Sequence, residues 1–294
     1  RTTTRRELDT RLAERAREAG ATIRFGAVFT DVAPRGQLLE VTAGRLKVRA
    51  RFVVGADGPM SRVARCGGLG AQRLCGAAYV RAFPESPRAL ECYRGTVFFH
   101  PAATTRGYGW IFPKRDHLNV GVYSQRPLDR SLLADLTTYV LQLGLDSWSI
   151  AGPYAAPIPT SVRLPAPGRG AVLLAGDAAG LADPITGEGI SHAMLSGRVA
   201  AESINEALSD SSGVTAKGPN AATIYARRLS EEVVPGLNRL RTPGNIMYSM
   251  GPRGIERAVA FPPARFVLRR LWWWERSGQA GGRLLVERTQ GARN

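Results

Sequence analysis

The sequence has 294 residues, enough for one large domain or two small ones, and the composition of an ordinary globular protein. Its 40 Lys and Arg against 24 Asp and Glu give a net charge of +16, which favours anionic partners such as cofactor phosphates or acidic lipid headgroups. No basic helix or aromatic-rich binding motif accompanies this charge, so nucleic acid is excluded as a partner. All but three of the cationic residues are Arg, and a coding bias explains that excess equally well.

The cysteines and the hydropathy pattern indicate the cellular compartment of the protein. Cys66, Cys75 and Cys92 form no C-x-x-C pair, which indicates a reducing compartment without a structural metal site. No apolar run reaches the roughly 18 residues of a membrane span, and no signal peptide is visible. We therefore expect a cytoplasmic protein, with peripheral membrane contact as an alternative.

The first 50 residues predict a helix followed by three short strands. In residues 4–20 apolar side chains recur at helical spacing, and Gly20 can end the helix. Alternating runs at 22–32, 37–43 and 45–50 are separated by glycine-containing turns and predict a β-meander.

A buried strand is predicted just before the turn Gly55-Ala56-Asp57-Gly58. Ser61 and Arg65 follow on a helical turn, with Arg62 as the alternative to Arg65. Gly58 lets the backbone approach a pyrophosphate, and Asp57 can bind flanking amides or a water. The alternative is a strand-end turn without a ligand.

Aromatic, strand-like runs at 77–83, 90–100, 107–113 and 118–123, with a helix at 132–143, predict a separate sheet. Alternate residues of a strand share a face, so Tyr108, Trp110 and Phe112 are expected to form an aromatic wall. Such a wall offers large apolar area and stiff side chains to a flexible prenyl chain. Ordinary sheet core is the alternative. His100 and His117 lack partners at metal-ligand spacing and are expected to be structural.

The chain is organised around residues 171–204. The apolar run 171–175 predicts a buried parallel strand that ends at Gly176-Asp177. Asp177 then lies at the carboxyl edge of the sheet, where open α/β sheets bind ligands. Residues 189–204 predict a helix, whose first N–H groups can face an electron-rich ring or an anion.

These motifs resemble those of a known family. The stretch GDAAGLADPITGEGISHAM resembles the second flavin-binding motif of p-hydroxybenzoate hydroxylase-type flavoproteins, most of all in the geranylgeranyl reductase branch. The turn at 55–58 with Ser61 and Arg65 is similar to the family motif GADGxxSxxR, and residues 108–113 resemble its YxWxFP signature. The resemblance implies an α/β (α+β) fold, in which an FAD-binding βαβ, three-layer domain carries an inserted mixed or antiparallel sheet domain and a helical C-terminal tail.

The resemblance also implies roles for single residues. In the family, the Asp of the Gly-Asp pair bonds the ribityl chain of FAD and the next helix faces the pyrimidine edge of the flavin. The residues implied to bind FAD are Arg5, Asp57, Gly58, Arg65, Gly176, Asp177, Ala178, Gly180, Pro184, Gly187, Glu188, Gly189 and Ile190. The implied substrate pocket is Tyr108, Trp110, Phe112 and Pro113. For Arg5 a solvated helix face is the alternative, and for His192, one turn into the helix, packing is the alternative to a place near the cofactor. No proton donor and no metal ligand is assigned.

The implied domains are an FAD-binding domain at 1–70 and 161–235, a substrate-binding sheet domain at 71–160, and a basic, aromatic C-terminal region at 236–294. The G-x-G-x-x-G turn that opens the FAD domain in this family is absent, so we expect that the sequence lacks its first βαβ unit. The C-terminal region holds eleven Arg, three Glu and Trp272-Trp273-Trp274, which suits an anionic bilayer interface or a cap over the substrate domain.

The implied activity is an FAD-dependent reductase that saturates C=C bonds of a geranylgeranyl or polyprenyl chain. NADPH or a ferredoxin-type protein would reduce FAD, and hydride would pass from FAD to the alkene. An isolated alkene also requires alignment, exclusion of water and a proton source. Two alternatives are a monooxygenase or halogenase on the same fold, and a non-catalytic flavoprotein remnant or lipid-binding protein.

Overall fold

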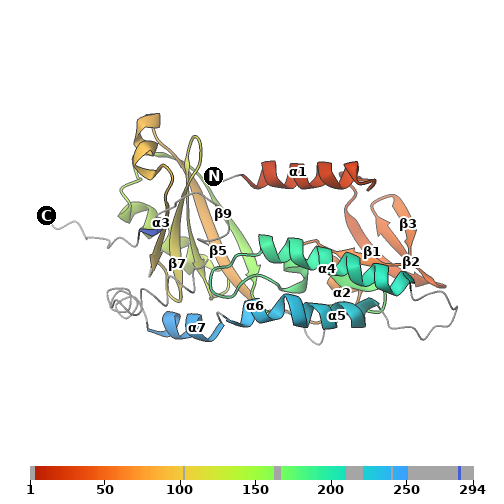
Figure 1. Cartoon of the computed structure of the whole chain (residues 1–294). Coiled ribbons are helices and arrows are strands. Elements are labelled where there is room, and N and C mark those ends of the chain that lie inside the picture. The colour runs from red at the N-terminus through yellow and green to blue at the C-terminus, as the bar shows by residue number, and fades with distance from the viewer. Residues whose placement is uncertain are drawn as a thin grey trace. The chain divides into compact units, whose positions relative to one another are not determined.

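The computed structural model describes residues 4–101, 103–161, 167–209, 221–239, 241–250 and 284–285. The chain has a mixed α/β fold and divides into two compact units (Figure 1). One, here called the motif unit, comprises residues 25–75 and 157–244. It holds the two turns with glycine and aspartate, at 55–58 and 176–177, which are called the Gly-Asp turns below. The other, the sheet unit, comprises residues 1–24, 76–156 and 245–294.

Helix α1 spans Arg5–Glu18 and has a complete capping box. Thr4 Oγ1 accepts a hydrogen bond from the Glu7 amide (3.2 Å), and the Thr4 amide donates to Glu7 Oε2 (3.1 Å). The helix ends at Glu18 with Ala19 as its C-cap, and Gly20 follows with a positive φ, as expected for a residue that ends a helix. No residue of α1 is buried, and α1 groups with the sheet unit. This division separates residues 1–24 from residues 25–70, and the domain bounds predicted from the sequence stay a prediction.

Two three-stranded sheets lie in the motif unit. Strands β1 (Phe29–Arg35), β2 (Leu38–Ala43) and β3 (Leu46–Ala50) form the predicted antiparallel meander, although residues 22–28 are not part of its first strand. The second sheet has the order β10-β11-β4, with bounds Gly168–Arg169, Val172–Leu174 and Val53–Gly55. Strands β11 and β4 run parallel, with Val172 opposite Val53 and Leu174 opposite Gly55.

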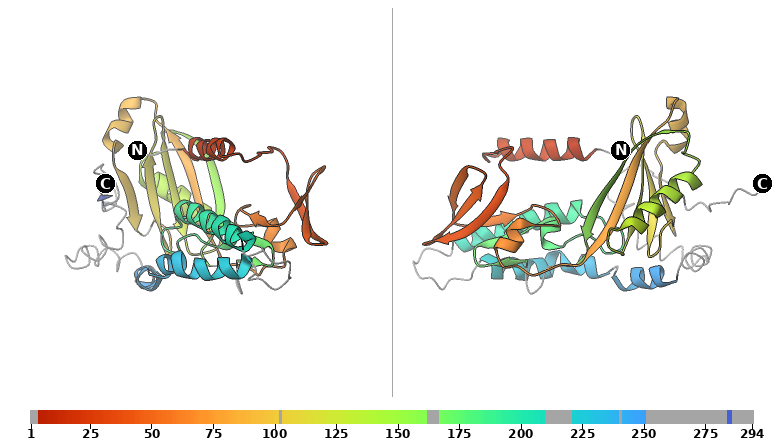
Figure 2. Two further views of the ribbon diagram at one scale, coloured as in Figure 1. Left: turned by 45° about the vertical axis from the view of Figure 1, so that its right-hand side comes forward. Right: turned by 180° about the vertical axis from the view of Figure 1, so that it is seen from behind.

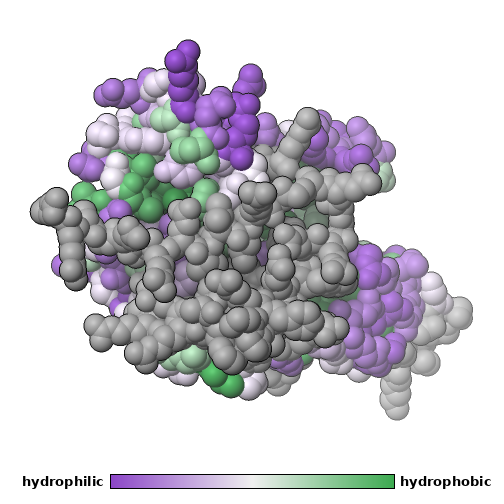
Figure 3. Space-filling model, turned by 60° about the vertical axis from the view of Figure 1, so that its left-hand side comes forward, coloured by the Kyte–Doolittle hydropathy of each residue, from purple (hydrophilic) through white to green (hydrophobic). Residues whose placement is uncertain are grey.

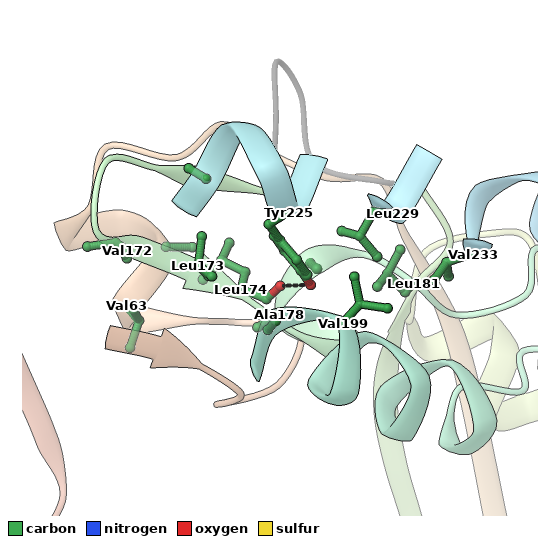
Figure 4. Close-up of a cluster of buried hydrophobic side chains, with 14 of the residues drawn as sticks. Val63, Val172, Leu173, Leu174, Ala178, Leu181, Val199, Tyr225, Leu229 and Val233 are labelled. Atoms are coloured by element: carbon green, nitrogen blue, oxygen red, sulfur yellow. Dashed lines mark hydrogen bonds between the residues drawn. The ribbon is translucent and has the colours of Figure 1, made fainter. Parts of the chain in front are cut away.

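Helices pack around this small mixed sheet, in which β10 runs antiparallel to β11. They are α2 (Arg62–Cys66), the 3-10 helix η2 (Gly176–Ala179), α4 (Ile190–Ser209), α5 (Ala221–Glu232) and α6 (Val234–Arg239). Figure 4 shows the core they enclose, in which Leu173, Leu174 and Val199 are fully buried around Tyr225. The hydroxyl of Tyr225 donates to the carbonyl of Leu174 (2.6 Å), so α5 is fixed to β11 at the point where the strand ends.

The sheet unit contains a six-stranded sheet in the order β12-β6-β7-β8-β5-β9. The bounds are Leu74–Phe83 for β5, Val97–Pro101 for β6, Gly107–Pro113 for β7, Leu118–Ser124 for β8, Ser149–Pro159 for β9 and Leu284–Leu285 for β12. The predicted strand at 90–100 is partly a 3-10 helix, η1 (Pro87–Tyr93). Helix α3 (Arg130–Gln142) lies along one face of this sheet, where its Leu132 and Leu136 pack with Val120 and Val122 (Figure 2).

Strand β9 was not predicted. Its sequence is rich in small residues and contains Pro153, Pro157 and Pro159, which lack the amide donor that a central strand needs. The structure places β9 at the edge of the sheet, where proline is tolerated.

The C-terminal prediction lies almost wholly outside the described residues. Of 236–294, the structure describes residues 236–239, helix α7 (Arg241–Ser249), Met250 and β12, while Trp272-Trp273-Trp274 lie outside the description. Among the helices described, none combines the length and apolar character of a membrane span. Figure 3 shows one face of the surface, on which a hydrophobic area lies among hydrophilic residues.

Candidate functional site

The two Gly-Asp turns lie at one edge of the same sheet. Because β4 and β11 are parallel and adjacent, their carboxyl ends meet, and the Ala175 amide donates to the Gly55 carbonyl there (2.9 Å). Asp57 follows β4 by two residues and Asp177 follows β11 by three. The fold therefore joins two motifs that are about 120 residues apart in sequence, at the place where parallel sheets bind ligands.

Gln72 connects the two motifs directly. Its side-chain Nε2 donates to the carbonyl of Pro59 (2.6 Å) and to the carbonyl of Asp177 (3.3 Å). Its Oε1 is buried and accepts no hydrogen bond from any described residue. Sequence reasoning missed Gln72, because a single polar residue in the loop after α2 belongs to no motif and no periodic pattern.

Asp57 is used within its own turn. Its carboxylate accepts hydrogen bonds from Ser61 Oγ (2.5 Å) and from the amides of Arg62 (2.7 Å) and Val63 (3.2 Å). It thus caps α2 together with Ser61, whose Oγ accepts from the Ala64 amide (2.9 Å). The turn leaves Gly58 with a positive φ of 80° and with nothing within 4 Å of a Cβ placed there. A direct contact between Asp57 and FAD stays a prediction, as does one from Arg65, which is exposed.

Asp177 lies beside the start of α4. A Cβ built on Gly189 would be 2.9 Å from Asp177 Oδ1, so only glycine lets the carboxylate come this close to the backbone. The amides of Gly189 and Ile190 donate to no described residue, as expected for the first N–H groups of a helix. A carboxylate acceptor and two backbone donors therefore stand together at this point.

A buried aspartate shapes the loop before α4. Asp183 is 5% exposed, and its Oδ1 accepts from the amides of Ile185 (2.9 Å) and Thr186 (2.7 Å). Its own amide donates to the carbonyl of Glu188 (2.7 Å). Sequence reasoning did not single out Asp183, although Asp-Pro dipeptides favour turns. The amides of residues 185–188 all donate within this loop, and those of the next two residues do not.

Glu188, in the loop before α4, pairs with residues of the first turn of that helix. Its carboxylate accepts from the amide of Ser191 (2.8 Å) and lies 3.4 Å from His192 Nδ1. Burial works to raise the pKa of Glu188, but the interactions with His192 and Ser191 outweigh it and lower this pKa to about 2. The Glu188 carboxylate in turn raises the pKa of His192 above its ordinary value of 6.5, against the effect of burial. Glu188 thus has partners in the chain, and its predicted contact with FAD stays a prediction.

The remaining predicted cofactor residues fall in two places. Five lie in the motif unit, in η2 or in the loop after it: Gly176, Ala178, Gly180, Pro184 and Gly187. A pocket next to them is lined by Thr160, Ser161, Gly180, Ala182, Pro184, Leu237, Asn238 and Arg241. Arg5 lies in the sheet unit, where its side chain is 70% exposed and its guanidinium bonds Asp9 at 3.2 Å.

The aromatic residues form a continuous row on the sheet unit. The ring centroids of Tyr108 and Trp110 are 6.1 Å apart, those of Trp110 and Phe112 are 5.9 Å apart, and Phe99 from β6 contacts Tyr108 and Phe112. Trp110 is 9% exposed, and its Nε1 donates to Asn119 Oδ1 (2.7 Å). The predicted shared face is therefore present. Pro113 is one residue further along β7 and pairs with the core residue Leu118, so strand alternation places it on the opposite face.

Comparison with known proteins connects this geometry to a family. Residues 2–120 match the family described as FAD binding domain. Over 228 residues the chain is 32% identical to digeranylgeranylglycerophospholipid reductase 1 of Methanopyrus kandleri. The matched region covers 70% of this chain and 58% of that protein. The chain has homologues named digeranylgeranylglycerophospholipid reductase. It spans about half to two thirds of the length of the curated relatives it matches.

Solved structures show that this flavoprotein fold is shared more widely. A geranylgeranyl bacteriochlorophyll reductase-like protein from Thermoplasma acidophilum superposes with a TM-score of 0.74 at 23% identity, covering 90% of this chain and 70% of that one. The flavin-dependent brominase Bmp2 superposes with a TM-score of 0.66 at 20% identity, covering 92% of this chain and 70% of that one. At these identities the likeness shows a shared fold and nothing more.

Proposed function

We propose that this chain belongs to an FAD-dependent reductase that saturates C=C bonds of a prenyl chain. The observation that carries the proposal is the group at the start of α4, where the Asp177 carboxylate stands beside the amides of Gly189 and Ile190. The row of Tyr108, Trp110 and Phe112 supplies an apolar surface for the prenyl substrate that would be reduced. The relative named digeranylgeranylglycerophospholipid reductase supports the substrate class.

The motif unit fits FAD on the chemistry of its donors and acceptors. Asp177 would accept hydrogen bonds from ribityl hydroxyls, and the amides of Gly189 and Ile190 would donate to the electron-rich pyrimidine edge. The open backbone at Gly58 would allow a phosphate to approach. When bound, FAD supplies the hydride for the alkene carbon. NADPH or a ferredoxin-type protein as electron donor, and peripheral membrane contact, belong to the same proposal.

The aromatic row would hold the prenyl chain in place and keep water away from it. Three stiff rings at centroid separations of about 6 Å offer apolar area without many rotatable bonds to be ordered. An unactivated alkene reacts only when it is held close to its reaction partner and water is excluded.

The first test is cofactor binding by the chain itself. We expect FAD added to the purified chain to show a perturbed visible spectrum and quenched fluorescence, and Asp177→Asn to weaken FAD binding about tenfold, because a charged acceptor becomes neutral. Asp146→Asn, which alters an exposed carboxylate in the sheet unit, is the control. Unchanged FAD affinity in Asp177→Asn would refute the assigned role of this residue. A chain that never binds FAD would favour a flavoprotein remnant.

The second test is turnover with a prenylated substrate in the absence of oxygen. A reductase, supplied with chemically reduced FAD, adds hydrogen to the substrate anaerobically, which mass spectrometry detects. The likeness to a brominase keeps an oxygen-dependent monooxygenase or halogenase as the second candidate. That candidate predicts no anaerobic product and an oxygenated or halogenated product in air.

A further inference from the structure

One end of the aromatic face carries a guanidinium group. Strand register places Arg81 of β5 opposite Asn119 of β8, and Asn119 opposite Phe112 of β7. Residues paired in this way share a face, so Arg81, Asn119 and Phe112 form a row across three strands on the side of the aromatic residues. The opposite face of the sheet packs against α3.

Arg81 has no acidic partner among the described residues. Its Cζ lies 4.8 Å from the ring centroid of Tyr154, and the same ring stacks on Tyr79 at 5.1 Å. The guanidinium is half-buried, and within the described part of the chain it makes no ion pair. A half-buried cation without a counter-charge favours an anionic ligand, because partial desolvation strengthens the attraction.

Asn119 adds a neutral donor next to Arg81. Its Oδ1 is occupied by the indole Nε1 of Trp110 at 2.7 Å, which orients the side-chain NH₂ as the remaining donor. Two acidic groups interact with other residues: Asp116 is bonded to His117 at 2.7 Å, and the charge of Glu7 acts on Lys114. Neither Asp116 nor Glu7 forms an ion pair with Arg81 in the described part of the chain.

We propose that Arg81 and Asn119 bind the phosphate end of a prenyl phosphate whose hydrocarbon chain lies along Phe112, Trp110 and Tyr108. Arginine donates two parallel hydrogen bonds to phosphate oxygens, and the asparagine amide adds a third donor beside them. This assignment rests on the proposed function. It specifies which end of the aromatic row receives the charged group, and it predicts that phosphorylated prenyl compounds bind more tightly than prenyl alcohols.

The test compares two ligands that differ only at the head: geranylgeranyl diphosphate and geranylgeraniol. Their affinities for the full chain are measured by calorimetry below the concentration at which they aggregate. Arg81→Gln is expected to weaken diphosphate binding about tenfold or more and to leave the alcohol within about twofold. Asn119→Asp keeps an acceptor for Trp110 and adds a negative charge, so it should weaken diphosphate binding selectively as well. Arg88→Gln, which removes an exposed charge on η1, is the control and should change neither.

The outcomes separate this proposal from the one it rests on. If the wild type binds both ligands equally, or if Arg81→Gln weakens both equally while the circular dichroism spectrum is unchanged, Arg81 only stabilises Tyr154 and the proposal is overturned. If either of these results is obtained while Trp110→Ala still abolishes binding of both ligands, the prenyl site stands without a phosphate end. If the wild type binds neither ligand, the proposed function fails as well.

Discussion

A small substitution at Gly121 should test how tightly the aromatic row is packed. Gly121 lies opposite Trp110 in the register of β7 and β8. A Cβ at position 121 would be 2.6 Å from two ring carbons of Trp110 and closer still to a third. Carbon atoms of unbonded groups need about 3.5 Å, so the indole must move. Gly121→Ala therefore adds a methyl group to a space that the ring of Trp110 already fills.

The expected cost follows from this overlap. Overpacking of a closed core costs about 1–3 kcal/mol, and each kcal/mol lowers the melting temperature of a large domain by about 2–4 °C. Gly197→Ala is the matched control, because a Cβ there has nothing within 4 Å and the residue is inside α4. That substitution should stabilise the chain by about 0.5–1 kcal/mol. Scanning calorimetry of both variants gives the comparison.

A double-mutant cycle with Trp110→Phe identifies the cause. The ring atoms near Gly121 belong to the six-membered part of the indole, which extends beyond where a phenylalanine ring reaches. The cost of Gly121→Ala should therefore fall below about 1 kcal/mol in the Trp110→Phe background, which is a coupling well above experimental scatter. An equal cost in both backgrounds would refute the argument, since the penalty would then come from the strand backbone and not from the indole.

Three further predictions concern the motif unit. Tyr225→Phe should lower the free energy of unfolding by about 1–2 kcal/mol in urea titrations, because the buried carbonyl of Leu174 loses its donor; an unchanged midpoint would mean that the hydrogen bond contributes nothing. Ser61→Ala removes a helix cap and should cost about 0.5–2 kcal/mol in the same assay, unless Asp57 alone suffices to cap α2. The contribution of His192 is complete below pH 6.5 and is lost as the pH rises through its raised pKa, whereas that of Glu188 is complete above pH 4.5 and is lost as the pH falls towards about 2. Melting temperatures from pH 5 to pH 9 should therefore decline less steeply on the alkaline side in His192→Gln than in the wild type, and parallel curves would contradict the assignment.

The strand that ends at a Gly-Asp turn could be predicted from the sequence, because it depends on residues that are close together in the chain. The apolar run 171–175 ends where Gly176 turns the chain, and β11 is found there. Alternation in residues 108–112 predicted a common face for three rings, and the ring contacts confirm it. These features depend on residues close together in sequence, whose periodicity is visible without tertiary information.

Features that depend on distant residues were not predictable. Gln72 is informative only once its contacts with Pro59 and with Asp177, 105 residues away, are known. For Asp57 the sequence predicted hydrogen bonds to flanking amides, and those from Arg62 and Val63 confirm it, whereas a contact between Asp57 and FAD stays a prediction. A local motif shows that a carboxylate is needed at a turn, whereas tertiary contacts decide which of its oxygens remain available.

The prolines of β9 have a consequence for how copies of this protein behave at high concentration. An edge strand with a full set of amide donors is a template on which another chain can add a strand, the first step of aggregation. Pro153, Pro157 and Pro159 remove three of these donors from the outermost strand on that side of the sheet. The edge of the sheet next to Tyr154 therefore resists pairing with a second molecule, and this protects a strand that also supports the guanidinium of Arg81.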